Sequence, residues 1–164
     1  MGFFPDVLVK DSKYDIITFH DVLEHIPDTN SILEACSQHL DKGGVLVVNC
    51  PSSTGLIYRI SKLLRKVGIK VFFERMWQKD LPSPHLHYFN LRNLAMLANI
   101  NGFEIILSGR LEAVNRDGLA ERISYAGNTS PLARRIVWLG INLMLPLMNV
   151  LPSDIVYCVA QKRC

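Results

Sequence analysis

The chain is 164 residues long, which is enough for one domain with a substantial buried core. Hydrophobic residues make up 49% of it and charged residues 20%, an apolar balance that suggests a face covered by a membrane or a partner. The net charge of +3 is too small to argue for nucleic-acid binding, so we expect no nucleic-acid partner.

Cysteine usage indicates a reduced, intracellular environment. The four cysteines, at positions 36, 50, 158 and 164, include no C-x-x-C pair of the kind found in zinc and redox sites. Cys36 shares a helical stripe with Leu33 and Leu40, and Cys50 ends an apolar run, so we predict buried free thiols. No signal peptide is recognisable. We therefore predict a cytoplasmic protein, with membrane association left open.

The first regular elements are predicted to be a strand, a helix and a second strand. Residues 14–19 form an apolar, β-rich run, and a helix follows Pro27 and ends at Lys42-Gly43-Gly44, where glycine can adopt the left-handed cap. Residues 45–50 form the next strand, apolar on both faces as parallel strands are. This order predicts a βαβ unit with parallel strands and a right-handed crossover.

The second half of the chain is predicted to contain two helices and two strands. Helical spacing of apolar residues covers 56–67 and 91–99, whereas the connection between them, 68–88, shows no regular pattern. Apolar runs predict the last two strands near 103–108 and 155–161.

A helical insertion, residues 112–150, is predicted before the last strand. Within it, residues 136–151 are nearly all apolar and follow Arg134-Arg135. The run is shorter than the ~20 residues that span a bilayer, and Pro146 would kink a helix. Interfacial anchoring, a hydrophobic acceptor pocket and burial against the sheet all stay open.

The helix at 56–67 is strongly amphipathic. Its basic residues are Arg59, Lys62, Arg65 and Lys66. This pattern fits a lid over an acceptor site, a helix on a membrane surface, or an ordinary amphipathic helix with a solvated face, and the sequence does not choose among them.

Ionisable side chains gather where the first predicted strand ends. His20, Asp21, Glu24 and His25 stand within six residues. In an open α/β sheet, ligands bind just beyond the carboxyl ends of the strands. Residues 21, 24 and 25 are spaced so that one face of a helix could present all three. We therefore expect a ligand site at this strand end, with His87 as a later imidazole near it.

Residues 14–26, with Tyr14-Asp15 at the start and Leu23-Glu24-His25 near the end, resemble the fourth strand and following helix of class I S-adenosylmethionine-dependent methyltransferases. Members of that family often read "(Y/F)D-V-I-x-x-x-x-V-L-E-H-(I/V)". Residues 101–104 look like the family's "G-F-E" entry into its sixth strand, and residues 153–162 look like its closing antiparallel strand.

The resemblance covers nearly the whole chain and implies an α/β fold. We expect residues 1–164 to be one domain, the carboxyl-terminal portion of a class I methyltransferase. Its sheet would be a partial Rossmann-like sheet in a three-layer arrangement, with parallel strands and a closing antiparallel strand. The family's glycine-rich turn, G-x-G-x-G, is not among the ten glycines. We therefore expect a fragment or truncated protein that by itself binds S-adenosylmethionine weakly or not at all.

The resemblance implies methyl transfer from S-adenosylmethionine to oxygen of a small-molecule, sugar or lipid-like acceptor. The competing class is a non-catalytic α/β module that binds a partner or a membrane. The resemblance assigns catalytic roles to Asp21, His25 and His87. It assigns cofactor contacts to Phe3, Phe4, Phe19 and His20.

Each assignment has a structural alternative. Asp21 could be a helix cap, His20 a loop residue, and the phenylalanines part of the core. Some relatives hold a divalent metal at this strand end with two carboxylates and histidines. Asp21, Glu24, His25 and His87 could play those parts, but we assign no metal ligand and keep a divalent metal as the alternative.

Overall fold

A four-stranded sheet lies at the centre of the computed structural model, which describes residues 4–9, 11–111, 118–125 and 130–163. The strands are β1 (Tyr14–His20), β2 (Leu40–Pro51), β3 (Phe103–Leu111) and β4 (Ile155–Lys162), in the order β1-β2-β4-β3. β1 and β2 are parallel, and β4 is antiparallel to both of its neighbours. The predicted strands, the parallel pair and the antiparallel closing strand are therefore confirmed.

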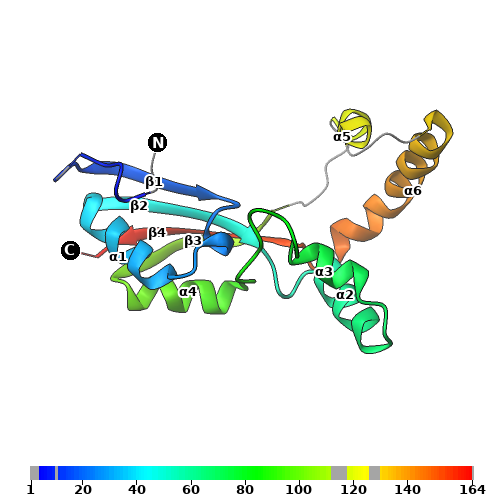
Figure 1. Ribbon diagram of the computed structural model, residues 1–164. Helices are drawn as coiled ribbons and strands as arrows, with labels where there is room; N and C mark the ends of the chain where they lie inside the picture. Colours follow the sequence, from blue (N-terminus) through cyan, green and yellow to red (C-terminus); the bar gives the residue numbers. More distant parts are fainter. Residues whose placement is uncertain (1–3, 10, 112–117, 126–129, 164) are drawn as a thin grey trace.

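Two helices, α1 (Thr29–His39) and α4 (Leu91–Ile100), lie together on one side of the sheet (Figure 1). The core forms between them and the alternate strand residues that point to that side. Its large, fully buried members include Leu33, Leu46, Val48, Leu94, Phe103 and Val156. Because β1 and β2 end at the same edge of this packed sheet, the side chains at their carboxyl ends are held close together.

Local signals explain where α1 begins, but not where it ends. Asp28 caps the helix, since its Oδ1 accepts a hydrogen bond from Ser31 N at 3.0 Å. The predicted end at Lys42-Gly43-Gly44 is wrong, because α1 ends at His39 and β2 begins directly after it. Gly43 does have a φ of +74°, but in the irregular start of β2, where the pairing with β1 shifts register.

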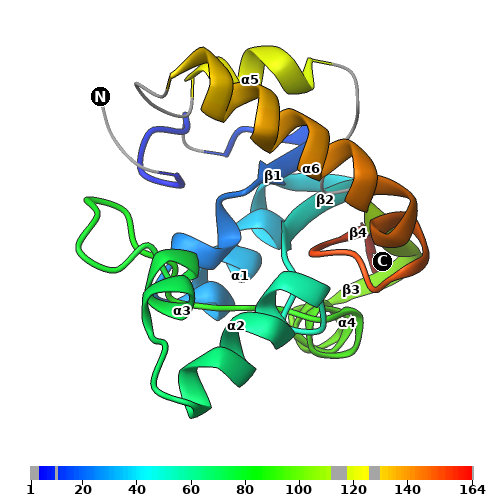
Figure 2. The ribbon, with the colours of Figure 1, turned by 90° about the vertical axis from the view of Figure 1, so that its right-hand side faces the viewer.

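The remaining helices lie beyond the carboxyl ends of the parallel strands. The connection predicted to be irregular contains α3 (Val71–Met76), which packs on α2 (Leu56–Lys66). The expected helical insertion contains α5 (Leu119–Tyr125) and α6 (Pro131–Val150), which pack on each other. Figure 2 places α5 and α6 on the side of the sheet opposite to α1. No helix in the described part of the chain is both long and apolar enough to cross a bilayer.

The thiols behave as the sequence predicts. Cys36, Cys50 and Cys158 are free and buried. Burial raises the pKa of Cys36 to about 12 and that of Cys158 to about 11. These thiols therefore stay protonated and unreactive near neutral pH. Cys164 lies outside the described residues.

A residue far along the chain, Asp154, caps the first turn of α2. Asp154, just before β4, accepts hydrogen bonds from the backbone N–H groups of Ile57 at 2.8 Å and Tyr58 at 3.3 Å. Gly55, the N-cap residue of α2, lies against it: a Cβ there would lie 2.2 Å from Asp154 Oδ1 and 2.6 Å from Asp154 Cα. The carboxylate supplies the cap that Gly55 cannot provide.

We expect Gly55→Ala to lower the free energy of unfolding by about 1–3 kcal/mol, because the added methyl group must displace Asp154 and its cap. Gly140→Ala is the matched control, since a Cβ there meets nothing within 4 Å. Urea denaturation of both variants measures the difference. Equal urea midpoints for the two variants would contradict the close contact between Gly55 and Asp154.

Candidate active site

A polar cluster joins the carboxyl ends of β1 and β2. The Asp21 backbone N–H donates to the Asn49 carbonyl oxygen at 3.2 Å, and the Asn49 amide reaches Asp21 Oδ1 at 3.4 Å. His20 Nδ1 also contacts Asn49 Oδ1. Asp21 has a φ of +51°, in the left-handed region that few residues other than glycine adopt. His20 and Asp21 are exposed here, at the edge where open α/β sheets bind ligands.

Sequence reasoning missed Asn49. It is the one polar residue in the second half of β2, residues 45–51, and in the sheet it pairs directly with His20. A buried amide at this position needs a hydrogen-bond partner, and His20 and Asp21 provide it. That position within the strand is the signal that could have identified it.

Glu24 is the most unusual residue of the site. It is fully buried, and neither carboxylate oxygen has a hydrogen-bond partner. Burial, with a smaller contribution from the negative charge of Asp21, raises the pKa of Glu24 above its ordinary value. The expected helical face with Asp21 is absent, because only the single 3₁₀ turn Leu23–His25 forms.

His25 is oriented by the loop before α4. Its Nδ1 lies 2.9 Å from the carbonyl oxygen of Pro84 and 3.1 Å from Ser83 Oγ. Because a carbonyl oxygen only accepts hydrogen bonds, this contact places the proton of the neutral ring on Nδ1. Nε2 is then the basic nitrogen, and it lies 4.0 Å from Glu24 Oε1.

His85 stands beside His25, with ring centroids 4.7 Å apart in an edge-to-face arrangement. Its Nδ1 lies 3.2 Å from the hydroxyl of Tyr88, which donates to the Met76 carbonyl oxygen at 2.6 Å. Its Nε2 lies 2.9 Å from the side-chain nitrogen of Gln78. Burial, and then the neighbouring His25, lower the pKa of His85, so this ring is neutral at pH 7.

His87 contacts main chain rather than His25. Its Nε2 lies 3.0 Å from the carbonyl oxygen of Ile26, and its backbone N–H donates to the carbonyl oxygen of Glu24. The sequence analysis placed His87 at the site, but the histidine that packs on His25 is His85, two residues earlier on the same extended segment. A catalytic part for His87 stays a prediction without support from these contacts.

Three donor atoms could hold a metal ion. One carboxylate oxygen of Glu24 and one ring nitrogen each from His25 and His85 lie within 4.8 Å of one another. Imidazole and carboxylate ligands suit zinc and similar divalent ions. Both ring nitrogens of His85 already have partners, so it would have to release one of them. The sequence analysis named Asp21, Glu24, His25 and His87 as possible metal ligands. Of these four residues, Glu24 and His25 are among the three that come together here.

Two of the phenylalanines assigned to the cofactor, Phe4 and Phe19, pack in or against the core. The ring of Phe4 meets Phe19 edge-on with centroids 5.8 Å apart, and it also packs against His39. Phe19 belongs to the hydrophobic core, and Phe4 packs onto that core. Cofactor contacts by Phe4, Phe19 and His20 stay predictions, and Phe3 lies outside the described residues.

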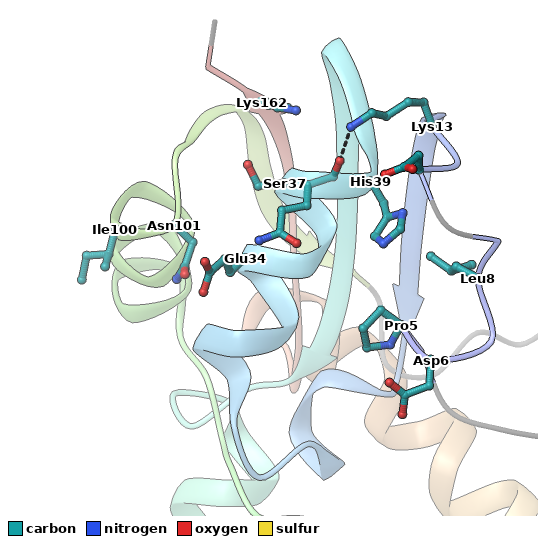
Figure 3. A pocket seen from close by; sticks show the side chains of 12 residues that line it. Pro5, Asp6, Leu8, Lys13, Glu34, Ser37, His39, Ile100, Asn101 and Lys162 are labelled. Atoms are coloured by element: carbon teal, nitrogen blue, oxygen red, sulfur yellow. Dashed lines mark hydrogen bonds between the residues drawn. The ribbon is translucent and has the colours of Figure 1, made fainter.

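A cavity of about 1050 Å³ lies away from this site (Figure 3). Its walls come from the chain before β1, the end of α1, the end of α4 and the end of β4, near the start of the parallel strands. Lys13 and Lys162 both donate to backbone carbonyl oxygens, and acidic side chains such as Glu34 share the wall. Because ligands of open α/β sheets bind at the carboxyl ends of the strands, we place the active site at the smaller polar cluster.

Similar proteins carry the same domain. A family described as "Methyltransferase domain" matches residues 2–108. A ubiquinone biosynthesis O-methyltransferase of Histophilus somni is 29% identical over 102 residues, which are 60% of this chain and 42% of that protein. Its counterpart from Pasteurella multocida is 46% identical over 37 residues, 23% of this chain and 15% of that protein. The chain thus spans less than half the length of these curated relatives.

Solved structures share the fold at low sequence identity. A putative sarcosine dimethylglycine methyltransferase from Galdieria sulphuraria aligns with 99% of this chain and 58% of its own, at 16% identity and a TM-score of 0.53. A phosphoethanolamine N-methyltransferase of Haemonchus contortus, solved with S-adenosyl-L-methionine, aligns with 92% of this chain and 34% of its own, at 17% identity and a TM-score of 0.54. With the family match over more than half of its length, the chain belongs to the class I S-adenosylmethionine-dependent methyltransferases.

Proposed function

We propose that the protein transfers a methyl group from S-adenosylmethionine to an oxygen atom of a small-molecule, lipid-like acceptor. The observation that carries this proposal is the basic Nε2 of His25 at the carboxyl end of β1, beside the buried Glu24. An oxygen acceptor needs its proton removed, and a positioned imidazole is the side chain that most often does so. The names of the curated relatives, ubiquinone biosynthesis O-methyltransferases, support an oxygen acceptor.

In the proposed reaction, S-adenosylmethionine supplies an electrophilic methyl group on a sulfonium. The acceptor oxygen attacks the methyl carbon in line with the carbon–sulfur bond, whose electron pair goes to the sulfur. The proton of the acceptor hydroxyl passes to His25 Nε2, while Nδ1 keeps its contact with the Pro84 carbonyl oxygen. The protein mainly holds the reacting groups close and aligned.

The strand-end residues would orient the cofactor. The exposed His20 and Asp21 are held by Asn49 at the carboxyl edge of the sheet, so they can present fixed polar groups to its methionine portion. We assign His85 a positioning role, because its ring packs on His25 and both of its nitrogens are held. A lipid-like acceptor would reside in a membrane, so we also propose peripheral membrane contact from the cytoplasmic side.

Methyl transfer is tested on the full-length translation product from the native source, with S-adenosylmethionine that carries an isotopically labelled methyl group. The acceptors are phenols with and without a prenyl tail, together with anilines of matched shape. We expect label on the phenols, with the prenylated phenol preferred. Label on the anilines alone, or cofactor binding without any labelled product, would refute the proposal.

A further inference from the structure

Helix α2 turns its apolar side outward. Ile57, Ile60 and Leu63, which share one helical stripe, are 45%, 47% and 63% exposed. Ser61, on the side that meets α3, is 2% exposed and lies 2.9 Å from the sulfur of Met76. A surface helix of a globular protein normally directs such a stripe into the core. Ser61 is the one buried residue of α2, Leu56, Tyr58 and Leu64 are half-buried, and the stripe of Ile57, Ile60 and Leu63 is available for contact.

The exposed apolar surface continues beyond α2. Val67 and Ile69 in the following turn, and Val71 and Phe72 at the start of α3, are all exposed. The two helices are held against each other by packing of Tyr58 on Phe73, with ring centroids 5.9 Å apart. We call this surface, formed by residues 57–72, the hairpin surface. Large exposed apolar surfaces of this kind mark contacts with proteins or membranes.

Cations border the apolar stripe on one side. Arg59, Lys62 and Lys66 follow α2 at helical spacing, all three are exposed, and none forms an ion pair within the described residues. α2 contains no acidic residue. An apolar stripe bordered by unpaired Lys and Arg is the pattern of a helix that lies in the interface of an anionic membrane.

A groove beside these cations has the chemistry of a phosphate site. It has a volume of about 360 Å³ and lies between the end of β2 and α2. The hydroxyl-bearing residues Ser53, Thr54 and Tyr58 line it, together with Arg59, Lys62, Leu63 and Lys66. Cationic and hydroxyl donors of this kind bind phosphate oxygens through charge-assisted hydrogen bonds.

We propose that the hairpin surface docks on a membrane that contains anionic phospholipids. The stripe of Ile57, Ile60 and Leu63 enters the interfacial region, and the groove binds a phosphate group of a lipid. Burial of the stripe and attraction of the cations act in the same direction. This docking assigns a surface to the membrane contact proposed above, and its test by vesicle binding does not depend on methyl transfer.

Docking by this surface would bring the membrane close to the candidate active site. Ring contacts connect the two: Tyr58 packs on Tyr88 at 4.7 Å, Tyr88 on His85 at 5.5 Å, and His85 on His25 at 4.7 Å between centroids. The inner side of α2 is thus three ring contacts from the proposed base.

Vesicle flotation of the full-length protein tests the docking, with phosphatidylglycerol-containing vesicles and pure phosphatidylcholine vesicles at low and high salt. We expect binding to the anionic vesicles at low salt and weaker binding at high salt, because salt screens the cations. Lys62→Gln with Lys66→Gln should weaken the binding about 30-fold, since each cation contributes a factor of about five. Ile60→Gln with Leu63→Gln should weaken it at both salt concentrations.

The matched control is Met96→Gln with Ile100→Gln on α4, where the side chains are 59% and 71% exposed and do not line the groove beside α2. Circular dichroism verifies that each variant is folded. No flotation with anionic vesicles at low salt would overturn the proposal, as would an equal loss in the α4 control. Binding of free glycerol phosphate with no flotation would show a soluble phosphate ligand instead, and a dimer abolished by Ile60→Gln would show a second copy on this surface.

Discussion

His25→Asn is expected to lower kcat/KM for methyl transfer by about 10²–10⁴-fold in the full-length protein, the range that general bases contribute. The asparagine amide can still donate to the carbonyl oxygen of Pro84, as Nδ1 does at 2.9 Å, but it provides no basic nitrogen in place of Nε2. The loop contact is thus kept while the proton acceptor is removed. Steady-state rates with labelled S-adenosylmethionine measure the loss.

A histidine away from the site provides the control. His39, at the end of α1, contacts the Ser12 carbonyl oxygen at 3.0 Å and lines the large cavity instead of the polar cluster. We expect His39→Asn to keep most of the activity, and Asp21→Asn to lose activity as His25→Asn does. Equal losses at His39 and His25, with lowered thermal midpoints for both, would indicate destabilisation and not catalysis.

Glu24→Gln is expected to make the protein more stable at neutral pH, by about 1–3 kcal/mol, because the amide removes a negative charge that is buried without a hydrogen-bond partner. Burial raises the pKa of Glu24 in the folded state above its ordinary value of 4.5. Below the ordinary value, both the folded and unfolded states hold the proton, and Glu24 contributes no pH dependence. As pH rises toward the folded pKa, the unfolded state ionises first, so the free energy of unfolding falls and then levels off.

The difference in unfolding free energy between Glu24→Gln and the unaltered protein should therefore grow as pH rises above 4.5 and then become constant. Urea denaturation between pH 4 and 8 measures it. Glu34→Gln serves as the control, because Glu34 is exposed on α1. A difference that does not change with pH would show that Glu24 has a partner for its charge. Added zinc that removed the difference would identify the metal as that partner.

Elements with a strong local pattern were predictable from the sequence. Residues 14–19 and 45–50 form strands as expected, because runs of β-branched and apolar residues favour extended backbone, even though most of β1 is exposed. The start of α1 after Pro27 was predictable because its cap is local: Asp28 accepts a hydrogen bond from a backbone N–H only three residues away. The resemblance of residues 14–26 to the methyltransferase strand and helix likewise identified the family that the comparisons confirm.

Contacts between residues far apart in the chain depended on the tertiary structure. Which of two imidazoles meets His25 is decided by how the extended segment 84–87 lies against the Leu23–His25 turn, and the spacing of His85 and His87 favours neither. The cap on α2 comes from Asp154, which the pairing of β4 with β2 brings to that helix. A sequence pattern records periodicity within one segment, whereas these contacts depend on where another segment packs.

The outward apolar stripe of α2 is a further feature that the local sequence pattern could not predict. The sequence alone determined that residues 56–67 form an amphipathic helix with a basic side, because that periodicity is local. Only the tertiary structure decided that Ser61 would be buried, that the rings of Tyr58 and Phe73 would pack together, and that Ile57, Ile60 and Leu63 would face outward. The physical reason is that the orientation of a helix depends on which other elements pack against it. In this protein α3 packs on the side of α2 that carries Tyr58, through the ring of Phe73.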